Sequence, residues 1–320
     1  MDFDVNLDVL MTALEPPPGH ERIEDPEAVP AGGFALRMDF DVSYPVGGSQ
    51  IDALEGVPLQ TPGEAPINGR FDTLMAQRMV SSDESLGGAI TEAVADLDVH
   101  PVSAVGRVTA VFGGRVRYCT GTVIAERLVL TAAHCAYART NPITGAGEFA
   151  DWMVFLPQYM SGRALGSWAG EAAYVPRGWG APSEGATAGL YDLALVRLDA
   201  PIAHVTGTAG VLANADPLGP FTSLGYPRKA SEGFAFDGNY LYASTGDRLP
   251  DATPGVIKAE NGLTEGSSGG PWFTSETGEM RIAGINSTEP VNSDAHTWSP
   301  KFGEAFQRLI ARALADMTGV

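Results

Sequence analysis

The sequence predicts an all-β protein, with a long irregular segment before the strands and one helix after them. From Pro101 onward, short runs rich in β-branched residues are separated by glycine-containing turns, a pattern typical of antiparallel strands. Residues 1–97 are instead rich in Asp, Glu, Pro and Gly. Many short strands at this spacing favour a β-sandwich or a β-barrel, and periodicity alone does not choose between the two.

The expected strands fall into two groups. The first group covers residues 105–112, 116–124, 128–131, 152–156 and 193–198, with Gly113-Gly114 as the turn after the first strand. The second group covers residues 223–226, 240–244, 255–258, 270–273 and 282–287. A helix is expected over residues 304–317, because its apolar side chains recur at helical spacing: Phe306, Leu309, Ile310 and Leu314.

Charge divides the chain into two unlike parts. Residues 1–100 hold 4 Arg and no Lys against 19 Asp and Glu, a net charge of −15 out of a total of −19. The remaining residues have a net charge of only −4. Neither part has the basic face that binding to phosphates requires, so nucleic acid is not an expected partner.

The N-terminal segment, residues 1–97, is expected to be largely irregular. Its prolines break regular elements, and its apolar residues are too sparse to bury a core. The first eight residues lack a basic region and an apolar run, so they do not form a secretory signal peptide. No stretch of about 20 apolar residues occurs, so no membrane span is predicted.

Three short strings contain residues suited to nucleophilic catalysis. Ser268 lies in the string GSSGGP at residues 266–271, and His134 lies in TAAHC at residues 131–135. Asp192 stands between them in YDLALV at residues 191–196. A serine hydroxyl is a poor nucleophile near neutral pH unless a base takes its proton, and that base needs a third group to orient it. The three residues therefore predict a nucleophile, a base and an orienting carboxylate.

On these strings the chain resembles the trypsin/chymotrypsin-like serine peptidases, which carry similar strings in the same order. The resemblance extends from about residue 100 to the C-terminus. It implies two packed six-stranded antiparallel β-barrels of the chymotrypsin type, at residues 100–205 and 206–300, followed by the helix. It also implies a peptidase domain over residues 98–320, with the active site in the cleft between the barrels.

The same resemblance implies a serine endopeptidase that cleaves polypeptide substrates through an acyl-enzyme intermediate. Ser268 is the expected nucleophile, His134 the base and Asp192 the orienting acid. The backbone N–H groups of Gly266 and Ser268 are expected to form the oxyanion hole. Neither a cofactor nor a metal is expected.

The two cysteines, Cys119 and Cys135, leave three possibilities open when taken alone: free thiols, part of a metal site or a disulfide. A metal site is disfavoured, because no second Cys/His pair stands at ligand spacing. The resemblance implies a disulfide, since related peptidases bridge the cysteine after the histidine to one on the preceding strand. Disulfides are typical of oxidising compartments, so a secreted or periplasmic location is expected despite the missing signal peptide.

The chain departs from the vertebrate pattern at Ser267, where those enzymes have an aspartate that pairs with a newly cut α-amino group. Activation of that type is therefore not expected. The single bridge and the string Gly225-Tyr226-Pro227 resemble the bacterial branch that includes the staphylococcal glutamyl endopeptidase. The N-terminal segment is accordingly interpreted as a pro-segment that blocks the cleft or assists folding, as an arm that contacts a partner, or as a solvated acidic linker.

The two best-known residue rules of this family predict neither basic nor acidic substrate selectivity for this chain. The position expected at the pocket floor holds Gly262 instead of the aspartate of trypsin. The position where glutamyl endopeptidases have histidine holds Asn286. Residues 287–289 are expected to pair with extended substrate backbone. The expected substrate-binding set is therefore Gly262, Leu263, Glu265, Asn286, Ser287, Thr288 and Glu289.

Three other classes of protein fit parts of this sequence. The string around Ser268 also satisfies G-x-S-x-G of α/β-hydrolases, but that fold needs its histidine after the serine and leaves the His134 string unexplained. A catalytically silent binding module on the same fold is a second alternative. A third is an intracellular or envelope regulatory peptidase whose acidic arm recruits a partner.

Overall fold

The computed structural model describes residues 39–40, 88–141, 146–179, 189–231, 234–251, 253–275, 278–287 and 296–318. Most of the predicted N-terminal segment lies outside these residues. So do Thr288 and Glu289 of the expected substrate-binding set.

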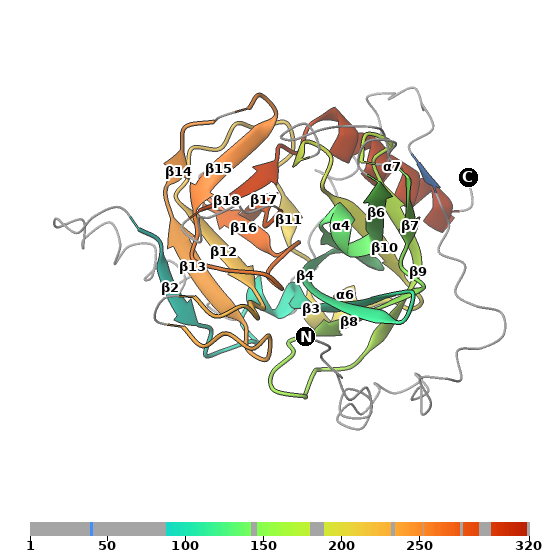
Figure 1. Ribbon diagram of the computed structural model, residues 1–320, viewed down its shortest axis with the longest axis horizontal. Helices are drawn as coiled ribbons and strands as arrows, with labels where there is room; N and C mark the ends of the chain where they lie inside the picture. The colour runs from blue at the N-terminus through green and yellow to red at the C-terminus, as the bar shows by residue number, and fades with distance from the viewer. Residues whose placement is uncertain are drawn as a thin grey trace.

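The first half of the described chain forms a closed barrel of six strands (Figure 1). The strands lie in the order β9, β10, β5, β4, β3, β8, and pairing of β8 with β9 closes the ring. Their bounds are β3 Val105–Phe112, β4 Arg115–Ala125, β5 Leu128–Thr131, β8 Trp152–Pro157, β9 Trp168–Val175 and β10 Ala194–Leu198. A two-residue strand, β1 (Asp39–Phe40), pairs in parallel with the end of β9.

The hairpin between β3 and β4 follows directly from the local sequence. Gly113 and Gly114 both have positive φ, 54° and 79°, a backbone conformation that glycine adopts without steric cost. Two such residues give the tight turn that matches the twist of paired strands. The register therefore runs from Phe112 opposite Arg115 to Val105 opposite Thr122.

The second half contains two sheets that share a core. One sheet has the order β11, β17, β16, β12, β13, β2, and the other has the order β14, β15, β18. Phe221, Ile257, Trp272 and Ala283, from both sheets, are at most 3% exposed and form one apolar cluster. The bounds are β11 Gly210–Val211, β12 Phe221–Gly225, β13 Tyr242–Gly246, β14 Arg248–Leu249, β15 Val256–Glu260, β16 Pro271–Thr274, β17 Arg281–Ile285 and β18 His296–Pro300.

Short elements connect these strands. They are η1 Val102–Ala104, α4 Ala133–Ala136, β6 Tyr137–Asn141, β7 Ala146–Phe149 and α6 Ala203–Thr206. Strands β6 and β7 form a hairpin of their own directly after α4. None of the helices in the described residues is long and apolar enough to cross a membrane. The closed six-stranded barrel, the strand-rich second half and the C-terminal helix agree with the predicted all-β fold class.

The N-terminal segment, expected to be largely irregular, contains one short strand near its end. Residues 90–93, inside the segment expected to be irregular, form strand β2 (Ile90–Ala93). This strand pairs antiparallel with β13, from Ala93 opposite Tyr242 to Ile90 opposite Thr245. Figure 1 shows β2 at the outer edge of the second half. A strand with little apolar content forms here because β13 offers it a free edge of backbone donors and acceptors.

The predicted C-terminal helix is present as α7 (Glu304–Thr318), and it returns to the first barrel (Figure 1). Phe306, Leu309 and Ile310 are at most 3% exposed and belong to the same core cluster as the side chains of β9 and β10. The Tyr174 hydroxyl on β9 donates to Asp316 Oδ2 at 3.1 Å. The helix therefore joins the end of the second half to the outside of the first.

We expect β2 to contribute measurably to stability. A protein lacking residues 1–97 loses this strand, whereas one lacking residues 1–86 keeps it. Loss of several backbone hydrogen bonds, each contributing a net 0.5–1.5 kcal/mol, should lower the free energy of unfolding by on the order of 2 kcal/mol. Urea denaturation of the two truncated proteins measures the difference. Equal free energies of unfolding would show that β2 contributes nothing.

Candidate active site

Asp192 is fully buried, and three donors surround its carboxylate. The His134 backbone N–H donates to Oδ1 at 2.9 Å, and His134 Nδ1 lies 2.8 Å from Oδ2. The Ser287 hydroxyl donates to the same Oδ2 at 2.6 Å. A carboxylate that accepts a hydrogen bond from Nδ1 fixes the imidazole tautomer and leaves Nε2 free to accept a proton.

These donors decide the charge state of Asp192. Burial by itself raises the pKa of a carboxyl group, because it disfavours the charged form. The His134 imidazole, the Ser287 hydroxyl and the His134 backbone N–H together outweigh burial and hold the pKa of Asp192 below its ordinary value. The carboxylate is therefore ionised at neutral pH.

His134 lies on the short helix α4, directly after the fully buried strand β5. Its side chain is 26% exposed, so one edge of the ring faces outward. The Arg117 guanidinium donates to the His134 carbonyl oxygen and packs over the ring of Phe112, 4.8 Å from its centroid. Burial lowers the pKa of Arg117, although Asp192 acts in the opposite direction.

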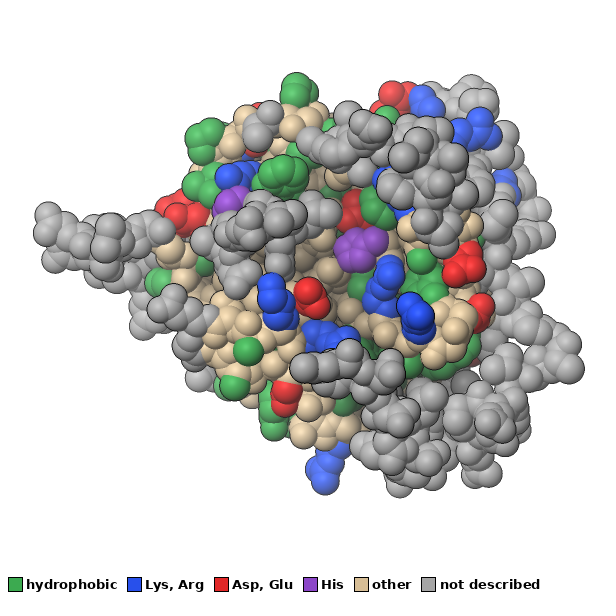
Figure 2. Space-filling model, viewed as in Figure 1, with side chains coloured by type: hydrophobic (Ala, Val, Ile, Leu, Met, Phe, Trp, Pro, Cys, Tyr) green, Lys and Arg blue, Asp and Glu red, His purple; other side chains and the backbone are tan. Residues whose placement is uncertain are grey.

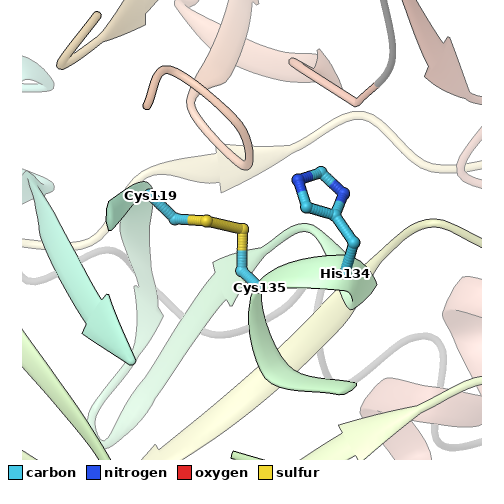
Figure 3. A group of neighbouring side chains, drawn as sticks. All are labelled: Cys119, His134 and Cys135. Carbon is cyan, nitrogen blue, oxygen red and sulfur yellow. A yellow bond between two sulfur atoms is a disulfide. The ribbon is translucent and has the colours of Figure 1, made fainter. Parts of the chain in front are cut away.

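The predicted disulfide between Cys119 and Cys135 is present, with the Cα atoms 6.2 Å apart. It ties β4 to α4, and Figure 3 shows it next to the His134 ring. The two sulfur atoms and the nearest ring nitrogen all lie within 4.8 Å of one another. Three such groups are a possible metal site, but sulfur atoms joined in a disulfide are not available as thiolate ligands. The group is therefore a structural bridge beside the imidazole.

Thr120 holds the loop that carries Ser268, a role that the sequence did not reveal. Its N–H donates to the Ser268 carbonyl at 2.8 Å, and its hydroxyl donates to the Gly266 carbonyl at 3.0 Å. The same hydroxyl accepts the Tyr226 N–H at 3.0 Å. Cys135 Sγ also lies 3.8 Å from the Ser268 carbonyl oxygen. The Ser268 loop is thus fixed against the strand and helix that position His134.

Two N–H groups of this loop are left available. Among the described residues, the N–H groups of Ser267, Gly269 and Gly270 have acceptors, whereas those of Gly266 and Ser268 have none. Gly266 has φ +95°, and a Cβ there would come within 2.4 Å of the Tyr226 carbonyl oxygen. Glycine alone fits this conformation without a clash, and no described residue accepts the N–H of Gly266.

Asn286, one of the expected substrate-binding residues, lies inside the protein beneath the Ser268 loop. It is 1% exposed, and its amide group is fully bonded inside the protein. Nδ2 donates to the carbonyls of Leu224 and Ser267, both at 3.2 Å. Oδ1 accepts from Asn261 Nδ2 at 2.8 Å and from Trp272 Nε1 at 2.7 Å. Asn286 therefore supports the Ser268 loop from behind.

The other expected substrate-binding residues occupy varied positions. Gly262 is part-buried, and its N–H donates to Ser244 Oγ, which is hydrogen-bonded to Thr91 Oγ1 of β2, both at 2.9 Å. Leu263 is buried, whereas Glu265 is exposed. Ser287 is 8% exposed, its N–H donates to the Trp298 carbonyl, and its hydroxyl belongs to the Asp192 network.

Fold and site together define a chymotrypsin-like serine peptidase. A family model described as Trypsin matches residues 106–310, which is more than half of the 320-residue chain. The chain therefore belongs to the trypsin family and is a serine-type endopeptidase. The predicted resemblance to this family is confirmed.

Several solved structures share this fold. Protease Anisep from Arthrobacter nicotinovorans is 27% identical, with a TM-score of 0.59, and the match covers 71% of this chain and 100% of that one. The thermostable serine protease AL20 from an extremophilic microorganism is 24% identical, with a TM-score of 0.58 and coverages of 66% and 96%. A Glu endopeptidase is 23% identical, with a TM-score of 0.58 and coverages of 72% and 98%. No curated protein matches the chain.

Acid should destabilise the protein partly through Asp192. Its pKa is lower in the folded than in the unfolded chain, so its contribution is complete above the ordinary pKa of 3.8 and is lost as pH falls through the folded value. The slope it adds is at most about 1.4 kcal/mol per pH unit. Denaturation of wild type and Asp192→Asn between pH 2.5 and 6, a range of about four units, should show a shallower fall in the variant. Parallel curves would contradict this.

Thr120 and Thr122 form a matched pair on β4, since both are fully buried. Within the described residues, the Thr122 hydroxyl has no hydrogen-bond partner. Thr120→Val should lower the free energy of unfolding by about 1–3 kcal/mol, because it leaves the Tyr226 N–H and the Gly266 carbonyl unsatisfied. Thr122→Val should change it by less than about 0.5 kcal/mol or raise it. Equal losses in both variants would contradict the role assigned to Thr120.

Proposed function

We propose that this chain hydrolyses peptide bonds through Ser268, His134 and Asp192. The observation that carries the proposal is the buried Asp192 carboxylate, which accepts from both the backbone and the ring of His134. The attachment of the Ser268 carbonyl to Thr120, beside the disulfide that follows His134, supports Ser268 as the nucleophile.

In the first step, Ser268 Oγ attacks the carbonyl carbon of the scissile bond while His134 Nε2 accepts its proton. The π electrons of the carbonyl move to its oxygen, and a tetrahedral intermediate forms. The imidazolium then gives its proton to the leaving nitrogen as the carbon–nitrogen bond breaks. Asp192 stabilises the imidazolium by its charge and keeps the ring oriented.

Backbone N–H groups stabilise the negatively charged oxygen of the tetrahedral intermediate. The N–H groups of Gly266 and Ser268 are available to donate to the developing negative oxygen. One such donor contributes about 2.7–4 kcal/mol to transition-state stabilisation. Water then attacks the acyl-enzyme with His134 again as base, which releases the carboxylic acid and restores Ser268.

We assign Gly262 and Glu265 to the surface around the substrate side chain before the scissile bond, with the buried Leu263 beneath that surface. The hydroxyls of Ser244 and Thr91 next to Gly262 favour a polar environment there. Residues 287–289 are proposed to pair with extended substrate backbone. The Ser287 side chain does not take part in this pairing, because its hydroxyl bonds Asp192.

The disulfide supports an oxidising location, and a secreted or periplasmic peptidase is proposed on that basis. Residues 98–320 are assigned to the peptidase domain, with β2 as an added strand from the preceding segment. The acidic segment before β2 is proposed to restrain the cleft or to contact a partner.

Covalent labelling tests the proposed nucleophile. A fluorophosphonate probe should label the wild-type protein and Ser267→Ala, the matched neighbouring control, but not Ser268→Ala, because only an activated serine hydroxyl reacts. In-gel fluorescence of the three proteins, each shown to be folded by circular dichroism, gives the answer.

Stronger labelling of a protein without residues 1–86 would support the restraining role of the acidic segment. Labelling that is absent from the folded wild type and from this truncated protein would overturn the proposed peptidase activity. It would favour a silent binding module on the same fold.

A further inference from the structure

Two arginines flank one tyrosine beside the Ser268 loop. Arg107 Cζ lies 4.9 Å from the centroid of the Tyr118 ring, and Arg228 Cζ lies 5.2 Å from it. Arg107 also packs over the Tyr159 ring, with Cζ 3.5 Å from its centroid. Guanidinium groups at these distances are attracted to the negative faces of the rings.

Neither arginine is neutralised by a carboxylate within the described residues. Arg107 is only 5% exposed, its Nη1 donates to the Gly238 carbonyl at 3.4 Å, and its guanidinium also has a hydrogen-bonding interaction with the Tyr159 side chain. Its Nε and Nη2 have no partner. Arg228 is exposed and has no ion pair with any residue that the structure describes, and its contact with Glu265 is a backbone bond from the Arg228 N–H to the Glu265 carbonyl at 2.7 Å. Buried charge without a counter-ion favours binding of an anion nearby.

The position of this group relates it to the proposed reaction. A Cβ on Gly266 would lie 3.1 Å from Arg228 Cγ, so the arginine borders the proposed oxyanion hole. Tyr118 precedes Cys119, whose disulfide partner Cys135 follows His134. In the proposed reaction, His134 gives its proton to the leaving nitrogen. The substrate residues after the scissile bond therefore pass on the side of His134 and of the disulfide next to it. Figure 2 shows several Lys and Arg side chains near the middle of the face viewed, with an Asp or Glu side chain among them.

We propose that Arg228, supported by Tyr118 and Arg107, selects substrates with an acidic side chain among the first two residues after the scissile bond. This inference rests on the proposed peptidase function and adds a substrate class to it. The substrate carboxylate pairs with the Arg228 guanidinium over the Tyr118 ring. The buried Arg107 adds positive potential behind the Tyr118 ring. Its packing against the rings of Tyr118 and Tyr159 holds it in place.

The test compares peptides that differ only in whether one side chain ends in a carboxylate (Glu) or in a carboxamide (Gln). A bond that the full-length wild type cleaves is first found in a peptide mixture, and the first or second residue after it is then set to Glu or to Gln. Wild type is expected to prefer one of the two Glu peptides. For that peptide its kcat/KM should be about fivefold higher than for the peptide with Gln at the same position. Arg228→Gln should remove this preference, so that its kcat/KM values for the Glu and the Gln peptide agree within about twofold.

Lys229→Gln provides the matched control, since it removes one positive charge from the neighbouring exposed residue and should keep the preference. The preference should also shrink as salt is raised from about 0.05 to 0.5 M, because Arg228 is exposed and screened.

The outcomes separate the inference from the function on which it rests. Equal cleavage of Glu and Gln peptides by wild type, or an unchanged preference in Arg228→Gln, overturns the inference and leaves the peptidase standing. If no peptide is cleaved and the fluorophosphonate probe does not react, the proposed function fails. Fluorescence anisotropy with Ser268→Ala then still decides the inference, since equal affinity for Glu and Gln peptides overturns it and tighter binding of the Glu peptide supports it.

Discussion

The burial of one negative charge organises the centre of this protein. Asp192 has no contact with water, and an ionised carboxylate is tolerated in such a place only when donors surround it. Those donors come from both halves of the chain: His134 lies on α4 of the first barrel, and Ser287 follows β17 of the second half. The pairing of the two halves and the orientation of the imidazole are therefore consequences of the same electrostatic requirement.

The Ser268 loop depends on a second set of contacts that also crosses between the halves. Thr120 from the first barrel bonds the carbonyls of Ser268 and Gly266, while Asn286 from the second bonds the loop from behind. Because these contacts use carbonyl oxygens, they leave the N–H groups of Gly266 and Ser268 without an acceptor among the described residues. The same hydrogen bonds thus hold the loop and aim its donors outward.

The sequence predicted the strands and the disulfide that have strong local signals, and its three short strings led to the proposed catalytic residues. Strand β3 and the disulfide agree with their predictions, and α7 differs by one residue at its end. Strand β9, with glycine and glutamate in its interior, has weak strand propensity and forms because β8 and β10 pair with it on both sides. Thr120 is one threonine among many in the chain. Its role depends on partners more than 100 residues away, which no local pattern encodes.

Helix α7 makes completion of the first barrel depend on the last residues of the chain to be synthesised. Its residues come last in the chain, yet Phe306 and Ile310 complete the core of the barrel that comes first. During synthesis, the strands from β3 to β10 leave the ribosome well before the helix that covers β9 and β10 exists. Until then, the apolar outer face of those strands stays in water or against a chaperone. The first barrel is therefore the earliest part of the peptidase domain to be made and among the last to be finished, which ties the completion of its core to the arrival of the whole chain.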